Sequence, residues 1–208
     1  MAEHDLPATT HSRLTVLAGP TAVGKGTISA DVRRRYPRVW LSTSVTTRPP
    51  RPGEVEGVHY HFVSPERFTQ MQQQGELLEW AVVHGRNSYG TPLAPLQERL
   101  RAGEPALLEI DLQGARQVRM RMPDARFVFL APPSWAELVR RLTGRGTEDA
   151  EERERRLATA RVEMAAVDEF DHIIVNDDVA RATDELVSLM TDGYDGSLDQ
   201  LSTSREDH

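Results

Sequence analysis

Residues 19–27 read GPTAVGKGT and combine glycines, one lysine and a threonine at a spacing suited to phosphate binding. The pattern G-x-x-x-x-G-K lies between a short apolar run at 13–18 and a stretch that favours a helix, which is the context of a P-loop. Glycines let successive backbone N–H groups turn towards phosphate oxygens, and the N-terminus of the helix adds its dipole. The segment therefore predicts a site for nucleotide phosphates.

Lys25 is the only lysine of the chain, so 25 − 1 = 24 of the basic residues are arginine. A codon bias towards arginine explains the other 24 basic residues but not the position of the exception. A compact, flexible ammonium group suits a phosphate-binding loop better than a planar guanidinium. We expect Lys25 to bridge the β- and γ-phosphates of the bound nucleotide.

The loop departs from the usual pattern directly after the lysine, where Gly26 replaces a serine or threonine and Thr27 follows one residue later. The hydroxyl that normally contacts Mg²⁺ is therefore absent, and Thr27 is expected to bond the α-phosphate. We expect Mg²⁺ to be held mainly through nucleotide oxygens and water, with a contribution from the acidic residues at the strand end at 109–111. We expect no metal held by protein ligands alone.

Arg48 and Arg51 lie three residues apart in a proline-braced loop, RPPRPGEVEG at 48–57. Guanidinium forks suit a dianionic phosphate. The same composition is also typical of a solvated basic loop. This segment by itself leaves both interpretations open.

Six further motifs follow the P-loop in one order. They are S-V-T-T-R-x-P-R-x-G-E-x-x-G-x-x-Y, E-W, Y-G-T, D-L-Q-G, R-G-T and V-N-D-D. Together with the P-loop they resemble the guanylate kinase family over about residues 13–190. The resemblance implies transfer of the γ-phosphoryl group of ATP to GMP, giving ADP and GDP, in purine nucleotide metabolism and GMP recycling.

The resemblance also implies residues that bind GMP. The expected phosphate ligands are Arg48, Arg51, Tyr60 and Tyr89, and the expected guanine contacts are Ser44, Glu79 and Thr91. A carboxylate at 79 accepts from both N1–H and the 2-amino group of guanine, and adenine presents the reverse pattern on that edge. A site that pairs polar groups in this way can discriminate against the wrong base by orders of magnitude in kcat/KM. Asp111 is expected to contact the base or ribose. Glu109, which stands where many relatives have aspartate, is also expected among the GMP-binding residues.

The family pattern further implies an ATP site and a lid. Catalytic roles are expected for Lys25, Arg48, Arg141, Arg145 and Arg156, because such cations stabilise the charge of a loose phosphoryl-transfer transition state. Asn176, in the V-N-D-D motif, is expected to contact adenine. The expected ATP-binding residues are Gly19, Pro20, Thr21, Ala22, Val23, Gly24, Lys25, Gly26, Thr27 and Asn176.

The elements that must position these residues are read from apolar periodicity and from turn signals. Strands are expected at 13–18, 39–44, 58–63, 77–83, 106–110, 126–130 and 172–175, a turn at 87–90, and helices at 27–36, from 65, and at 92–102, 112–122, 134–143, 151–166 and 179–190. Alternating strands and helices predict an α/β fold, a parallel sheet flanked by helices. Trp40 and Trp80 are expected in the core.

The consecutive strands within 46–91 break the alternation and predict a small mixed α/β insertion, which the resemblance makes the nucleoside-monophosphate-binding part. We expect a core at 13–45 and 92–190, a helical lid at 142–156, and disordered tails at 1–12 and 191–208.

The composition limits partners and location. The net charge is 25 − 32 = −7, which gives no general attraction to nucleic acid, and there are no cysteines. The N-terminal residues lack an apolar signal segment, and no apolar run approaches the ~20 residues of a membrane span. We expect a cytoplasmic protein, monomer or homodimer, that binds the small molecules GMP and ATP but neither nucleic acid nor membrane.

Three other functions compete with this interpretation. A related P-loop kinase with another acceptor is disfavoured by Ser44, Glu79 and Thr91, which suit a purine base. A catalytically inactive interaction module of the guanylate kinase type is disfavoured by Lys25 and the lid arginines. A GTPase switch would need the motif N-K-x-D, which the single lysine excludes.

Overall fold

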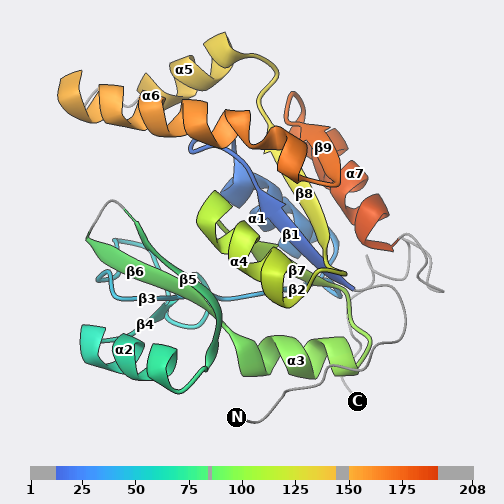
Figure 1. Cartoon of the computed structure of the whole chain (residues 1–208). Coiled ribbons are helices and arrows are strands. Elements are labelled where there is room, and N and C mark those ends of the chain that lie inside the picture. The colour runs from blue at the N-terminus through green and yellow to red at the C-terminus, as the bar shows by residue number, and fades with distance from the viewer. Residues whose placement is uncertain (1–12, 84–85, 144–149, 192–208) are drawn as a thin grey trace.

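The computed structural model describes residues 13–83, 86–143 and 150–191, apart from the side chains of Ala150 and Glu152, and folds them into two sheets surrounded by helices (Figure 1). The main sheet has five strands in the order β2-β7-β1-β8-β9, and all its pairings are parallel. Its strands are β1 (Leu14–Ala18), β2 (Trp40–Leu41), β7 (Ala106–Glu109), β8 (Arg126–Ala131) and β9 (His172–Val175). The predicted fold class, a parallel sheet flanked by helices, is confirmed.

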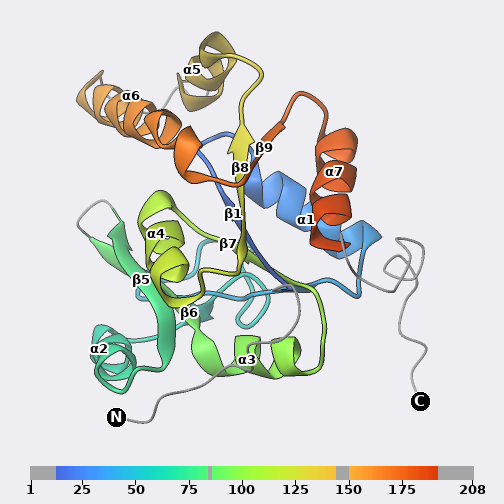
Figure 2. The same cartoon turned by 45° about the vertical axis from the view of Figure 1, so that its right-hand side comes forward.

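Helices cover both faces of the main sheet because its side chains alternate between two buried clusters. Leu17 packs in one cluster with residues of α1 (Lys25–Arg35) and α7 (Val179–Thr191). Val16 packs in the other cluster with residues of α3 (Leu93–Arg101) and α4 (Leu112–Arg121). Figure 2 shows α1 and α7 on one side of the strands and α3 and α4 on the other.

The second sheet is mixed and has the order β4-β3-β6-β5. Its strands are β3 (Val45–Thr46), β4 (His61–Phe62), β5 (Leu77–Val83) and β6 (Asn87–Pro92). Helix α2 (Pro65–Gln73) buries Phe68 and Met71 against it. Ser64 caps α2 by accepting a hydrogen bond from the backbone N–H of Arg67 at 3.2 Å.

The predicted turn at 87–90 is wrong, because these residues open strand β6, which pairs antiparallel with β5. Gly90 allows the close approach of the two backbones, since a Cβ atom there would lie 2.9 Å from the carbonyl oxygen of Glu79. The prediction that Trp80 lies in the core is also wrong. It lies on the edge strand β5 and is 40% exposed.

The strands predicted at 39–44 and 58–63 are much shorter in the structure, because only two residues of each pair with a neighbour. Most other boundaries shift by one or two residues, and the strands predicted at 77–83 and 172–175 are reproduced. Among the described residues, no helix combines the length and apolar character that a membrane span requires.

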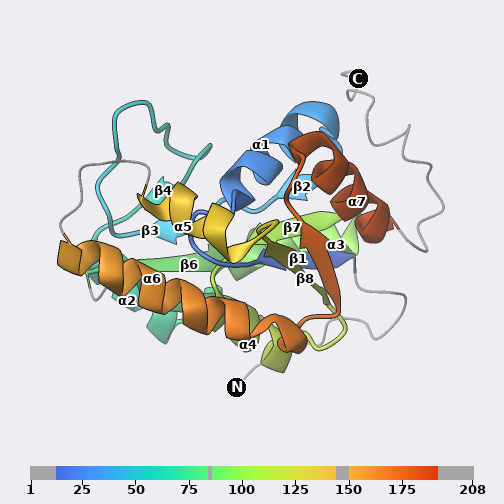
Figure 3. The same cartoon turned by 90° about the horizontal axis from the view of Figure 1, so that it is seen from above.

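Helices α5 (Trp135–Thr143) and α6 (Ala150–Ala165) lie above the two sheets in the view of Figure 1, and Figure 3 shows α6 from above. Leu138 of α5 and Ala160 of α6 are fully buried in the cluster that also holds α1. A short 3₁₀ turn, η1 (Val167–Glu169), leads from α6 to β9. Arg145 and both predicted tails, except Thr191 at the end of α7, lie outside the described residues.

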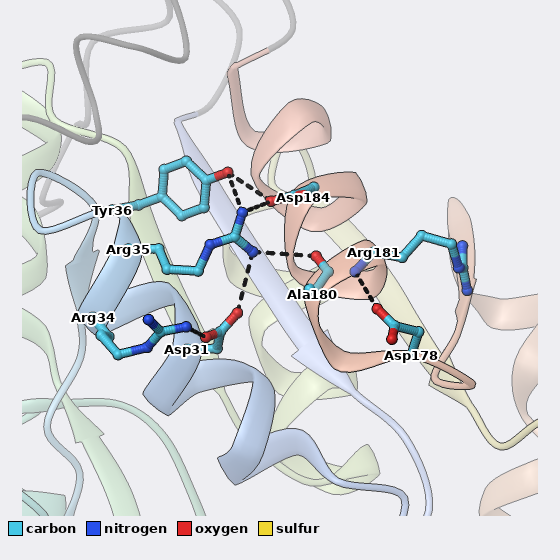
Figure 4. A network of polar contacts seen from close by, with 8 residues as sticks. All are labelled: Asp31, Arg34, Arg35, Tyr36, Asp178, Ala180, Arg181 and Asp184. Atoms are coloured by element: carbon cyan, nitrogen blue, oxygen red, sulfur yellow. Dashed lines mark hydrogen bonds and ion pairs between the residues drawn. The ribbon is translucent and has the colours of Figure 1, made fainter.

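A polar network joins α1 to α7 on the surface (Figure 4). The guanidinium group of Arg35 donates to Asp31, Asp184 and the carbonyl oxygen of Ala180. The hydroxyl of Tyr36 donates to Asp184 at 2.7 Å. The network therefore links the helix that follows the P-loop to the last described helix.

Candidate active site

The loop at residues 19–24 joins β1 to α1 in the strand–loop–helix order of a P-loop. Gly19 has a φ of 150°, and a Cβ atom on it would lie 2.3 Å from the carbonyl oxygen of Leu130. Gly24 caps α1 with a φ of 106°, a conformation that glycine adopts without strain. Ala22, at a φ of 67°, is the one non-glycine residue with positive φ among the described residues. Both glycines are thus required by geometry, as a phosphate-binding loop demands.

Lys25 is the first residue of α1, and its side chain folds back over the loop. Its Nζ donates to the carbonyl oxygen of Gly19 at 2.5 Å and to that of Pro20 at 3.4 Å. Burial lowers the pKa of Lys25, while the carboxylates of Glu163, Glu109 and Asp111 raise it. The ammonium group is therefore held within the loop that would cradle phosphates.

Two of the predicted site residues, Asn176 and Arg141, donate hydrogen bonds to the backbone of this loop. The side-chain amide of Asn176 donates to the carbonyl oxygen of Val23 at 2.8 Å, and Asn176 is only 4% exposed. Arg141 of α5 donates to the same carbonyl oxygen at 3.0 Å and to Glu137 at 2.8 Å. Asn176 and Arg141 thus lie against the P-loop in this structure, and the adenine contact of Asn176 stays a prediction.

Glu163 of α6 is a site residue that sequence reasoning missed. Its carboxylate accepts a hydrogen bond from the backbone N–H of Thr21 at 2.9 Å. Burial raises the pKa of Glu163, while the bond from Thr21 and the charge of Lys25 lower it. Within α6, Glu163 looks like one more charge on a charged helix, and only its neighbourhood in space shows that it contacts the P-loop.

Arg48, which follows β3, lies in a tight polar and aromatic cage and is 9% exposed. Its two terminal nitrogens donate to the carboxylate of Glu54 at 2.9 and 2.8 Å, and Nε donates to the hydroxyl of Tyr89 at 3.2 Å. The hydrogen bonds from Arg48 lower the pKa of Glu54 to about 2. The ring of Tyr60 lies 5.8 Å from that of Tyr89. Three of the four predicted phosphate ligands therefore come together.

Arg51, the fourth predicted phosphate ligand, is exposed, and its backbone N–H donates to Glu54 at 2.7 Å. Glu54 therefore ties together the backbone of Arg51 and the side chain of Arg48. The motif at 44–60 contains this glutamate, but the sequence analysis predicts no role for it.

Glu79 and Thr91 form a buried pair between β5 and β6. The hydroxyl of Thr91 donates to Oε1 of Glu79 at 2.7 Å, and the two residues are 0% and 4% exposed respectively. Burial raises the pKa of Glu79 to about 7, with the charge of Asp111 adding to the rise and the bond from Thr91 opposing it. Ser44, just before β3, is partly buried. The sheet thus places a buried carboxyl group where a polar ligand could meet it.

Asp111 and Glu109 lie between the two sets of residues. Asp111 caps α4 by accepting from the backbone N–H of Gly114 at 2.8 Å. Its charge acts on both Lys25 and Glu79, and the charge of Glu109 acts on both Lys25 and Tyr60. The P-loop lysine and Glu79 therefore share one carboxylate neighbour, Asp111.

Arg156 lies on the inner face of α6 and is partly buried, two helical turns before Glu163. It shares that face with Leu157, Ala160 and Met164, which pack against the main core. Arg145, the remaining predicted lid arginine, lies outside the described residues. The structure therefore positions two of the three predicted lid arginines on the helices α5 and α6.

Comparisons with known proteins give the family of the chain. A family profile described as Guanylate kinase matches residues 11–193. The guanylate kinase of Thermobifida fusca is 62% identical over 178 residues, covering 86% of this chain and 90% of that protein. The guanylate kinase of Streptomyces coelicolor is 61% identical over 184 residues, covering 88% of this chain and 93% of that protein.

Solved structures give the same result. A guanylate kinase from Anaplasma phagocytophilum superimposes with a TM-score of 0.72 at 32% identity, covering 92% of this chain and 94% of that one. A dephospho-CoA kinase from Campylobacter jejuni shares the fold, with a TM-score of 0.52 at 11% identity over 87% of this chain and 98% of its own. The chain belongs to the guanylate kinase family.

Proposed function

We propose that this chain transfers the γ-phosphoryl group of ATP to GMP, giving ADP and GDP, as a step of purine nucleotide metabolism. The observation that carries the proposal is the buried Glu79–Thr91 pair. It shares the neighbour Asp111 with the P-loop lysine. A P-loop alone indicates a binding site for nucleotide phosphates. The buried carboxyl group adds an acceptor that can recognise a base with two adjacent hydrogen-bond donors.

Guanine fits this pocket through its N1–H and 2-amino groups, which donate to the ionised carboxylate of Glu79. The hydroxyl of Ser44 donates to O6 of the base, while the hydroxyl of Thr91 donates its one proton to Glu79 and so orients the carboxylate that meets the base. One carboxylate oxygen of Asp111 accepts the capping hydrogen bond of α4, and the other accepts a hydrogen bond from the base or ribose in this proposal. Adenine leaves Glu79 without donors at N1, and an unsatisfied buried carboxylate is costly.

The GMP phosphate binds at Arg48, Arg51, Tyr60 and Tyr89 in this proposal. Glu54 holds the guanidinium of Arg48 by two hydrogen bonds and thereby fixes the direction of its fork. A fixed fork binds a phosphate with less loss of side-chain freedom than a free one. Glu109 is exposed, and its charge acts on both Lys25 and Tyr60.

ATP binds along residues 19–27, with Asn176 near adenine. An oxygen of the GMP phosphate attacks the γ-phosphorus in line, and ADP leaves without a covalent enzyme intermediate. Lys25, Arg141, Arg145 and Arg156 stabilise charge on the transferring group. In this scheme the core spans 13–45 and 92–190, the GMP-binding insertion 46–91 and the lid 142–156.

Mg²⁺ fits this site as a companion of ATP. Among the described residues, no group of three His, Asp or Glu side chains gathers to hold a cation. Magnesium favours phosphate oxygens, water and one or two carboxylates over a protein cage. When bound, the ion neutralises charge on the β- and γ-phosphates, and Glu109 is the exposed carboxylate beside Gly26 that could meet its water shell. We place the protein in the cytoplasm, as a monomer or homodimer.

The experiment that tests this function compares kcat/KM for GMP and for AMP in the wild type and in Glu79→Gln. The amide keeps one acceptor but turns the second oxygen into a donor, so we expect kcat/KM for GMP to fall about 10- to 100-fold. The value for AMP should not fall. Glu76→Gln is the matched control, because Glu76 lies in the same insertion and pairs with Arg67. An unchanged value for GMP in Glu79→Gln contradicts the proposal.

A further inference from the structure

Gly114 occupies the first turn of α4, where glycine has no conformational reason to be. The described glycines with positive φ are Gly19, Gly24, Gly53, Gly57, Gly75 and Gly103, and Gly114 is not among them. In a helix, alanine is more favourable than glycine because glycine loses more backbone freedom. Its backbone N–H caps onto Asp111, a bond that any residue except proline could make. The reason for glycine at 114 must therefore be space.

The space in question is taken up by the carboxyl group of Glu79. A Cβ atom at 114 would lie 2.6 Å from Oε2 and 3.1 Å from Cδ of Glu79. The first distance is well inside a normal contact, whose optimum between carbon atoms is roughly 3.5–4.0 Å. Oε1 of the same carboxyl group is held by the Thr91 hydroxyl at 2.7 Å. The carboxyl group thus lies between a hydroxyl on one side and the bare backbone of Gly114 on the other.

The strand that carries Glu79 cannot move away from α4, because the helix holds its backbone. The side-chain amide of Gln117 donates to the carbonyl oxygen of Trp80 at 2.7 Å and accepts from its N–H at 3.2 Å. Arg121 donates to the carbonyl oxygen of Leu77 at 2.9 Å and to that of Leu78. Positions 114, 117 and 121 lie on one face of the helix. A methyl group at 114 would therefore displace the carboxyl group rather than the strand.

We propose that Gly114 is a positioning residue for base selection, whose missing side chain provides the space that keeps the Glu79 carboxyl group facing guanine. This inference rests on the proposed function, since it assigns to Gly114 the placement of the group that reads the base. The residue touches neither nucleotide in this account and acts through Glu79 alone.

The expected result of Gly114→Ala separates this role from a general structural one. We expect the KM for GMP to rise about tenfold or more, because one displaced hydrogen bond to a charged group is worth at least that factor. The ratio of kcat/KM for GMP over AMP should fall, while the KM for ATP stays within twofold. A general structural defect would lower the melting temperature. We expect no such fall in Gly114→Ala, because alanine is more favourable than glycine in a helix.

Gln113→Ala is the matched control, because Gln113 is the exposed neighbour on the same turn of α4. The decisive comparison places Gly114→Ala in a Glu79→Ala background, where the space is open. There it should leave both the dissociation constant of GMP and the melting temperature unchanged. If the single variant does not fold, the double variant must recover the melting temperature of Glu79→Ala.

A wild-type KM for GMP in Gly114→Ala, or an equal effect with and without the Glu79 side chain, overturns the inference. These results differ from a failure of the proposed function. In that case Glu79→Ala alone would leave GMP binding unchanged, or the wild type would not phosphorylate GMP.

Discussion

Glu79 is deeply buried, and its pKa lies near neutral pH. Burial raises its pKa to about 7, so in the ligand-free protein the carboxyl group is protonated at lower pH and ionised above that value. Only the ionised form accepts hydrogen bonds from both donor groups of guanine. The proposed function therefore predicts that the binding of GMP is coupled to the loss of a proton from this group.

The pH dependence of kcat/KM for GMP tests this coupling, because this parameter reports the groups of the free enzyme. We expect it to rise as pH increases through about 7 and to lose this limb in Glu79→Gln. The second ionisation of the GMP phosphate, at roughly pH 6, remains visible in the variant. Glu76→Gln should keep the wild-type profile. A limb near pH 7 that persists in Glu79→Gln would assign it to another group.

The sequence predicted these single residues unevenly. Arg48, Glu79 and Thr91 could be predicted as site residues because they stand in motifs with a fixed order. Glu163 was missed because its partner Thr21 is 142 residues away, and no spacing along α6 indicates that contact. Gly114 was read only as part of a motif, since its role depends on an atom of a strand that comes earlier in the chain.

Helix α6 is fixed to the P-loop at Glu163 and to the core at Leu157, Ala160 and Met164. Arg156 projects from the same face two turns earlier. The hydrogen bond at Thr21 therefore helps to set where Arg156 lies relative to the phosphates.

Replacing Glu163 tests this arrangement. We expect Glu163→Ala to lower kcat about tenfold, because a lost hydrogen bond of this kind is worth about one factor of ten. Glu163→Gln keeps an acceptor for the Thr21 N–H and should retain most of kcat. Val162→Ala, at the exposed neighbouring position, is the control. Equal rates for the alanine variant and the wild type would show that the contact does not position the lid.

The α1–α7 network predicts a change of stability without a change of activity. Asp184→Asn removes the charged acceptor of Arg35 and Tyr36. Because the side chain of Asp184 is itself half exposed, we expect a loss of about 1 kcal/mol or less, or roughly 2–4 °C in Tm, with unchanged kcat. Glu185→Gln is the control, since Glu185 pairs with Arg181 inside α7. A large fall in kcat would tie this surface to the active site.

Helices and long strands could be predicted because their patterns are local. Strands β3 and β6 were missed because β3 pairs only two residues and because β6 reads as a turn until its partner is known. Short strands gain their hydrogen bonds from distant segments, so the sequence near them carries little signal.

The whole molecule brings together a P-loop on one parallel sheet and a buried carboxyl group on a second sheet. Helix α4 joins them, since Asp111 at its start acts on both Lys25 and Glu79, and Gln117 and Arg121 hold strand β5. In the proposed function ATP binds at the P-loop and GMP at the buried carboxyl group, and direct transfer requires the two nucleotides to meet.

The most direct test is the production of ADP from Mg·ATP with GMP, AMP, CMP and UMP offered separately to the wild-type protein, with Lys25→Ala as a control for contaminating kinases. We predict rapid ADP production with GMP alone and a loss of at least about 10²-fold in Lys25→Ala. Equal turnover with another nucleotide would contradict the guanine assignment. Binding of GMP without turnover would contradict the kinase function and favour an interaction module.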